Sequence, residues 1–135
     1  SLLSGQYPNT SNLIPTDFEY ILTTNLDNFY SAIDRAALLT QNKDKNLINM
    51  KTAGNEAVIT SFASEIGKSE ESDDITKNND KDITISYSAK YMLDALKTLK
   101  DDELIILMNG DSKPIILKNA KDDSLIQLIL PIKTY

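Results

Sequence analysis

The pattern of apolar and polar positions predicts a strand, a helix and two further strands in the first half of the chain. Apolar residues alternate with polar ones over 18–24, which is typical of a half-buried strand. They then recur at helical spacing over 26–41, directly after Asn25, which is a favourable N-cap residue. The runs 47–52 and 57–62 flank a short turn and predict a strand pair.

The second half begins in the same way. Residues 83–87 alternate as in a half-buried strand, and Ser88 can cap a helix that runs to about Lys100. Three more strands are expected, separated by turn residues such as Asn109-Gly110-Asp111. These strands are 104–108, 115–118 and 125–130.

A polar, acidic segment, 65–82, lies between the two halves. It contains seven acidic residues and three lysines, so it carries −4 of the formal net charge of −6. Its first part can still be an edge strand, because charge is one way in which sheet edges avoid pairing with other chains. Residues 77–80 are expected to form a loop.

The order of these elements predicts an α+β fold. A β-α-β-β unit of about 60–65 residues is used twice, the second time with an extra strand. Such units give antiparallel sheets with two helices packed on one face.

Composition narrows the possible chemistry. The 135 residues suffice for one domain, and they include no cysteine and no histidine. Disulfides, thiolate metal sites and the usual general base are therefore excluded. The acidic pairs Asp73-Asp74, Asp101-Asp102 and Asp122-Asp123 can bind Mg²⁺ or Ca²⁺, but their positions at turns and element ends favour solvated polar residues. We expect no metal, no cofactor and no catalytic residue.

Four segments resemble the third domain of the bacterial β sliding clamps, the β subunit of DNA polymerase III. They are Gly5 to Pro15, Ala32 to Leu39, Ser88 to Leu96 and Gln127 to Tyr135, and they occur in the family's order across the whole chain. The terminal Leu130-Pro-Ile-Lys-Thr-Tyr135 is the most specific of them. Their form is closer to Firmicute or mollicute clamps than to proteobacterial ones.

The resemblance implies a DNA-clamp domain with sheets outside and two helices on the inner face of a ring. Residues 1–15 would be the tail of the middle domain and the connector, and 16–135 the C-terminal clamp domain. The chain opens Ser-Leu-Leu, without Met, which favours a piece of a longer protein. The family is a non-enzymatic, cytoplasmic homodimer that encircles duplex DNA and tethers the replicative polymerase. The polymerase α subunit, the clamp loader and repair polymerases dock to it through a short linear motif.

By position, the resemblance places a peptide-docking pocket partly on this chain, with its other wall on the middle domain. Without the resemblance, Leu128 and Leu130 would be core residues of a strand, and Tyr91 an aromatic residue on a helix face. Asn12 and Ser88 depart from the residues common in the family, which puts polar contacts at the rim in doubt. The expected wall is Pro8, Asn12, Leu13, Ser88, Tyr91, Ser112, Pro114, Leu128, Leu130, Pro131 and Ile132.

Two further surfaces follow from the resemblance. Arg35, Lys43, Lys90 and Lys97 would face DNA without reading its sequence, although a solvated helix face explains them equally well. A ring interface would use Leu38, Leu39, Glu65, Glu70 and Glu71. The alternatives are a core position for the leucines and a solvated edge for the acids.

The runner-up function is a stand-alone adaptor that binds peptides without joining a ring. Two more repeats upstream in the full-length gene would exclude it.

Overall fold

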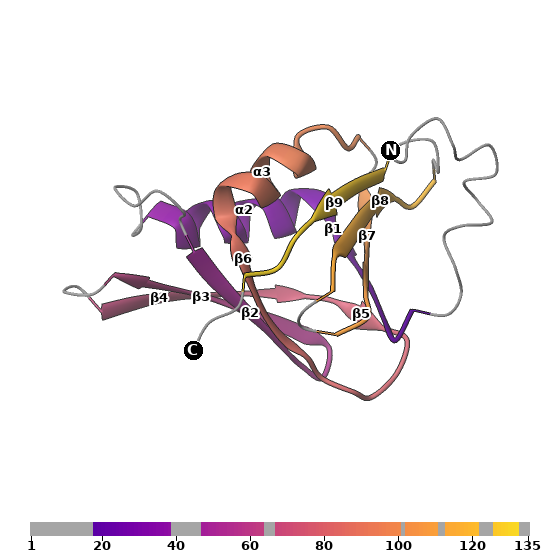
Figure 1. Ribbon diagram of the computed structural model, residues 1–135, viewed down its shortest axis with the longest axis horizontal. Helices are drawn as coiled ribbons and strands as arrows, with labels where there is room; N and C mark the ends of the chain where they lie inside the picture. Colours follow the sequence, from indigo (N-terminus) through magenta and orange to yellow (C-terminus); the bar gives the residue numbers. More distant parts are fainter. Residues whose placement is uncertain are drawn as a thin grey trace.

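The described part of the chain folds into two antiparallel sheets and two helices that lie side by side (Figure 1). The computed structural model describes residues 18–38, 47–63, 67–100, 102–110, 113–121 and 126–132. Helix α2 (Leu26–Ala37) contacts helix α3 (Ala89–Leu96). The α+β architecture expected from the sequence is therefore confirmed.

The strands within the described ranges form one sheet of four and one of five. The four-stranded sheet has the order β4-β3-β2-β6, with β4 (Gly67–Asp74), β3 (Glu56–Ala63), β2 (Leu47–Ala53) and β6 (Thr84–Ser88). The five-stranded sheet has the order β5-β1-β7-β8-β9, with β5 (Thr76–Lys77), β1 (Tyr20–Asn25), β7 (Glu103–Met108), β8 (Ile115–Asn119) and β9 (Ile126–Ile129).

The two repeats exchange their first strands. β1 pairs with β7 of the second repeat, from Tyr20 opposite Met108 to Asn25 opposite Glu103. In the corresponding way, β6 pairs with β2 of the first repeat, from Leu47 opposite Ser88 to Lys51 opposite Thr84. Each sheet therefore contains strands from both halves of the chain, and neither sheet is complete without the other half.

Each helix begins directly after the last residue of the preceding strand, which is its N-cap, and both caps are as expected. The Asn25 side chain accepts a hydrogen bond from the Asn28 backbone N–H at 2.8 Å. The Ser88 hydroxyl accepts one from the Tyr91 backbone N–H at 3.3 Å. A side-chain acceptor at this position satisfies an N–H group that has no partner inside the helix.

The core lies between the helices and the sheets. Burying a large apolar side chain there stabilises the fold by about 1.5–3 kcal/mol before the entropy cost of ordering it. The largest fully buried side chains come from both helices and from strands of both sheets. They are Tyr87, Phe29, Leu22, Ile33, Ile48, Met50, Ile59, Ile85, Met92, Leu96, Leu104 and Ile106.

The structure corrects the expected end of the second helix. α3 ends at Leu96 rather than near Lys100. The backbone N–H groups of Thr98 and Leu99 donate to carbonyls three residues earlier, at 3.1 Å, which tightens the last turn. The Lys100 N–H then donates to the Asn119 side chain of β8 at 3.1 Å, so the chain leaves the helical path.

Two strand expectations are also corrected. β6 is not half-buried, because Ser86 is buried along with its apolar neighbours. Its backbone carbonyl accepts from Ile132 at 2.8 Å and its hydroxyl from Asn49 at 3.0 Å, so other segments cover this side of the strand. Residue Lys77, expected in a loop, belongs to the two-residue strand β5.

The acidic segment does form an edge strand, as predicted. β4 is an outer strand of its sheet and pairs with β3 over its full length. The preceding hairpin between β2 and β3 turns through Gly54, whose φ of 64° lies in the left-handed region that glycine adopts without strain.

Candidate functional site

Exposed apolar side chains gather where α3 meets β9. The two elements are in contact, and Figure 1 shows them side by side. Tyr91 on α3 is 65% exposed, Leu128 on β9 is 58% exposed, and Leu130 just beyond β9 is 68% exposed. Large apolar side chains grouped in this way on a surface are typical of a binding site.

The fold holds this segment firmly from both sides. Ile129 is buried, and it pairs with Ile115 of β8 between the two exposed leucines. After β9 the chain crosses to the other sheet, where the Ile132 N–H donates to the Ser86 carbonyl at 2.8 Å. Leu128 and Leu130 therefore stand on a backbone that is hydrogen-bonded before and after them.

An apolar stripe continues from Leu128 across the same sheet. Leu128 lies opposite Ile116 on β8, and Ile116 lies opposite Leu107 on β7. Ile116 is partly exposed and was not predicted as a site residue. The run Ile115-Ile-Leu117 is apolar throughout, so the sequence pattern alone could not tell which residue faces outward.

The other expected pocket residues differ from one another in how exposed they are. Pro114 is exposed, whereas Pro131 and Ile132 are partly exposed. Ser88 is buried, with its hydroxyl accepting from the backbone of α3, so its assignment to the pocket stays a prediction. Pro8, Asn12, Leu13 and Ser112 lie outside the described residues.

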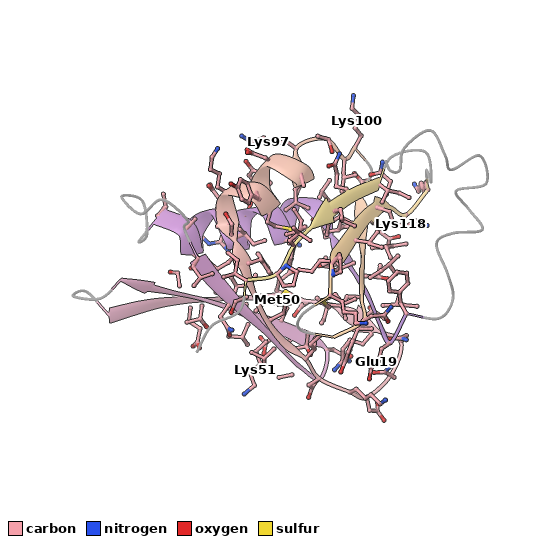
Figure 2. All side chains as sticks on the ribbon, in the orientation of Figure 1. Glu19, Met50, Lys51, Lys97, Lys100 and Lys118 are labelled. Carbon is pink, nitrogen blue, oxygen red and sulfur yellow. The ribbon has the colours of Figure 1, made fainter. Side chains whose placement is uncertain are left out.

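The basic residues expected to face DNA do not form one surface of unpaired charge. Lys90 pairs with Asp94 at 3.5 Å across one helical turn, and both side chains are exposed. Arg35 binds Glu71 of β4 at 2.9 Å. Lys97 points away from the sheets on the helix side, as does Lys100 (Figure 2). Lys43 lies outside the described residues.

The residues expected at a ring interface lie at the end of α2 and along β4. Leu38 is 61% exposed, so the alternative of a core position is wrong for this leucine. Glu70 is exposed, and Glu71 is partly buried by its ion pair with Arg35. Leu39 and Glu65 lie outside the described residues.

The described residues contain no group of three or more metal-ligating side chains close enough to hold an ion. The described helices are also too short and too polar to cross a membrane.

A family model described as the C-terminal domain of the DNA polymerase III beta subunit matches residues 11–133. The chain belongs to this family. The match covers both sheets, both helices and the surface formed by α3 and β9, and it confirms the resemblance seen in the sequence.

Relatives of this clamp domain come from the expected group of bacteria. The beta sliding clamp of Staphylococcus epidermidis is 44% identical over 135 residues, and that of Staphylococcus aureus is 42% identical over 134 residues. Both alignments cover 99% of this chain and 36% of the relative. The chain thus spans about a third of the length of the curated relatives that it matches.

Solved structures agree with the sequence relatives. The DNA polymerase sliding clamp from Bacillus subtilis has a TM-score of 0.82 and 36% sequence identity, over 98% of this chain and 35% of that chain.

Proposed function

We propose that this chain is the C-terminal third of a ring-shaped sliding clamp. In this function the ring tethers the replicative polymerase to duplex DNA, and the chain contributes one wall of a docking site for peptide motifs. The chain itself is non-catalytic. Family membership supports the clamp, and the exposed surface of Tyr91, Leu128 and Leu130 supports the docking site.

The physical basis of docking is an apolar surface that is already in place before a ligand arrives. A linear motif with Leu and Phe anchors needs such a surface and a few polar groups at its rim. β9 is paired with β8, and Ile132 just after it is hydrogen-bonded to Ser86 of the other sheet. Because the backbone around Leu130 is already fixed, binding costs little additional ordering of the domain.

The domain assignment follows the same proposal. Residues 1–15 are the tail of the middle domain and the connector, and 16–135 the clamp domain. The whole ring would be a homodimer of longer chains in the bacterial cytoplasm, with polymerase α subunit, clamp loader and repair polymerases as partners. The residues for contact between protomers are Leu38, Leu39, Glu65, Glu70 and Glu71.

Contact with DNA would be weak and independent of sequence. Lys97 at the end of α3 is the best-placed cation, whereas Lys90 and Arg35 have acidic partners that reduce their attraction for phosphates. Weak contact suits a ring that slides, because the closed ring itself prevents dissociation.

The test is a titration of the 135-residue chain with a fluorescent peptide of the Gln-Leu-x-Leu-Phe type. We expect saturable binding, and a Kd that rises at least about tenfold in Leu130→Asp, because a charge replaces an apolar contact. Leu38→Asp is the matched control. It changes a similarly exposed leucine at the end of helix α2, and we expect binding to remain as in the unmodified chain.

Equal weakening by both substitutions would contradict the placement of the site. Absence of binding in the unmodified chain would require the same pair of variants in a polypeptide that includes the preceding domain, because the second wall of the pocket belongs there. Leu130→Asp without effect in that longer chain would overturn the docking proposal.

A further inference from the structure

An aspartate is buried at the corner where the chain passes from one sheet to the other. Asp73 lies near the end of edge strand β4, three residues before β5 begins, and is only 6% exposed. Its carboxylate oxygen Oδ2 lies 2.6 Å from the hydroxyl oxygen of Thr24, which is also buried. Thr24 belongs to β1, so this contact joins the two sheets.

The Thr24 hydroxyl faces two acceptors with a single hydrogen. Its oxygen lies 2.6 Å from the Asp73 carboxylate and 2.9 Å from the Asp74 backbone carbonyl. A hydroxyl group can donate only one hydrogen bond, although it can accept two. If Asp73 is ionised, one of the two acceptors receives no hydrogen from Thr24. If Asp73 is protonated, its own O–H donates to Thr24, and the Thr24 hydroxyl donates to the Asp74 carbonyl.

We propose that Asp73 and Thr24 form a hydrogen-bond relay that joins the edge strand β4 to β1 of the other sheet. The direction of its hydrogen bonds depends on whether Asp73 is protonated. In the protonated state the relay runs from the Asp73 carboxyl group through the Thr24 hydroxyl to the Asp74 carbonyl, and every contact is a hydrogen bond. In the ionised state Thr24 turns to the carboxylate and releases the Asp74 carbonyl. The hydrogen bonds that connect β4 to β1 therefore depend on whether Asp73 carries a proton.

The surroundings of Asp73 favour the protonated state. Burial is the largest influence and raises the pKa of Asp73 above its ordinary value, and the neighbouring charge of Asp74 adds to this. The Thr24 hydroxyl and a backbone hydrogen bond at Asp74 act in the opposite direction without cancelling the rise. A buried carboxyl group behaves in this way because ionisation is unfavourable in a less polar environment.

Charged groups on the elements around Asp73 do not reverse this preference. From α2, Arg35 lines the polar cleft beside Asp73, but its guanidinium is bound to Glu71 on β4. From β3, Glu56 lies opposite Asp74, while uncharged Ala57 lies opposite Asp73. From β7, Glu103 lines a second cleft together with Thr24 and Asp74. Of the neighbouring charges, that of Asp74 raises the pKa of Asp73.

The linkage between protonation and stability has a definite sign. The pKa of Asp73 in the unfolded chain is near its ordinary value of 3.8, and folding raises it. The stability that the relay contributes is therefore fully present below pH 3.8 and is lost as the pH rises through the pKa in the folded domain. Above that pKa, the buried carboxylate lowers the stability of the fold.

The direct test is an NMR titration of the Asp73 side-chain carboxyl carbon in the unmodified, isotope-labelled chain, from about pH 3 to about pH 8. We expect a midpoint above 3.8. A midpoint at or below 3.8 would overturn the relay, and this measurement does not depend on a variant that folds.

The second test compares melting temperatures of Asp73→Asn and the unmodified chain over the same pH range. The carboxamide N–H can donate to Thr24 at every pH, so the variant should become progressively more stable than the unmodified chain as the pH rises. Asp80→Asn is the control, since it removes an exposed carboxylate that is not next to Asp73. A pH-independent difference between Asp73→Asn and the unmodified chain would contradict the proposal.

Discussion

At the scale of single residues, Tyr87 has a large buried ring and a hydroxyl group with only a weak hydrogen-bond partner. Its side chain is fully buried between the sheets and the helices. The hydroxyl contacts the Met50 sulfur at 3.6 Å, and a thioether is only a weak acceptor. Burial raises the pKa of Tyr87 far above its ordinary value of 10.0, so the hydroxyl stays protonated wherever the domain is folded.

We expect Tyr87→Phe to change the free energy of unfolding by less than about 0.5 kcal/mol, or to raise it. The substitution removes a buried polar group that has poor compensation and leaves the ring in place. Tyr87→Ala, which also removes the ring, should cost about 3–5 kcal/mol. Urea unfolding followed by circular dichroism measures both values. A loss above about 1 kcal/mol in Tyr87→Phe would mean that the hydroxyl has a stronger partner than sulfur.

At the scale of elements, the Asp82 carboxylate is one of the groups that connect the segment between β5 and β6 to the rest of the fold. Asp82 Oδ1 accepts hydrogen bonds from the Thr52 hydroxyl at 3.3 Å and from the Gly54 backbone N–H at 3.2 Å. It also binds the Lys77 ammonium group, which donates to the Lys81 carbonyl at 2.8 Å as well. One side chain thereby connects this segment to the β2–β3 hairpin and to β5.

The Lys77 ammonium group holds the pKa of Asp82 below its ordinary value of 3.8. A group of this kind stabilises the fold above the pKa of the unfolded state, and the contribution is lost as the pH falls through the lower pKa of the folded state. We therefore expect Asp82→Asn to lower the midpoint of urea unfolding at neutral pH, and the difference to shrink below pH 3.8.

Asp80→Asn is the matched control for this prediction, because Asp80 is an exposed aspartate in the same segment. It should leave the midpoint almost unchanged at both pH values. Equal stability of Asp82→Asn and the unmodified chain at neutral pH would show that the three contacts to Oδ1 add nothing to folding.

At the scale of the whole molecule, the strand exchange makes the two repeats depend on each other. Without the second repeat, β2 loses its partner β6 and β1 loses its partner β7. The same separation exposes apolar core faces on both helices, since α2 and α3 pack together. The stability of the domain is therefore shared between the repeats rather than being the sum of two independent units.

We expect a polypeptide ending at residue 80 and a second one starting at residue 81 to be largely unfolded when each is alone. Mixed together, they should form one domain with a cooperative thermal transition, because each supplies the missing strand of the other's sheet. Circular dichroism melting of the separate and mixed halves measures this. A cooperative transition in either half by itself would contradict the interdependence of the repeats.

The sequence alone determined most of the elements and the family. Periodicity and the capping residues placed both helices, and the charge of the acidic segment allowed the edge strand β4, because each signal depends on neighbours only a few residues apart. The assignment of Leu128 and Leu130 to the proposed docking surface was reached only through the resemblance. Without the resemblance, the pattern around Leu128 and Leu130 indicates a buried strand.

The tertiary structure decided everything that depends on partners distant in the sequence. It placed β1 and β6 in the sheets of the opposite repeats, ended α3 through the bond from Lys100 to Asn119, and buried Ser86 beneath the C-terminal segment. It also brought Asp73 to Thr24, 49 positions away. The physical reason is that periodicity reports which side of an element avoids water, whereas burial and hydrogen bonding are set by whichever segment covers that side.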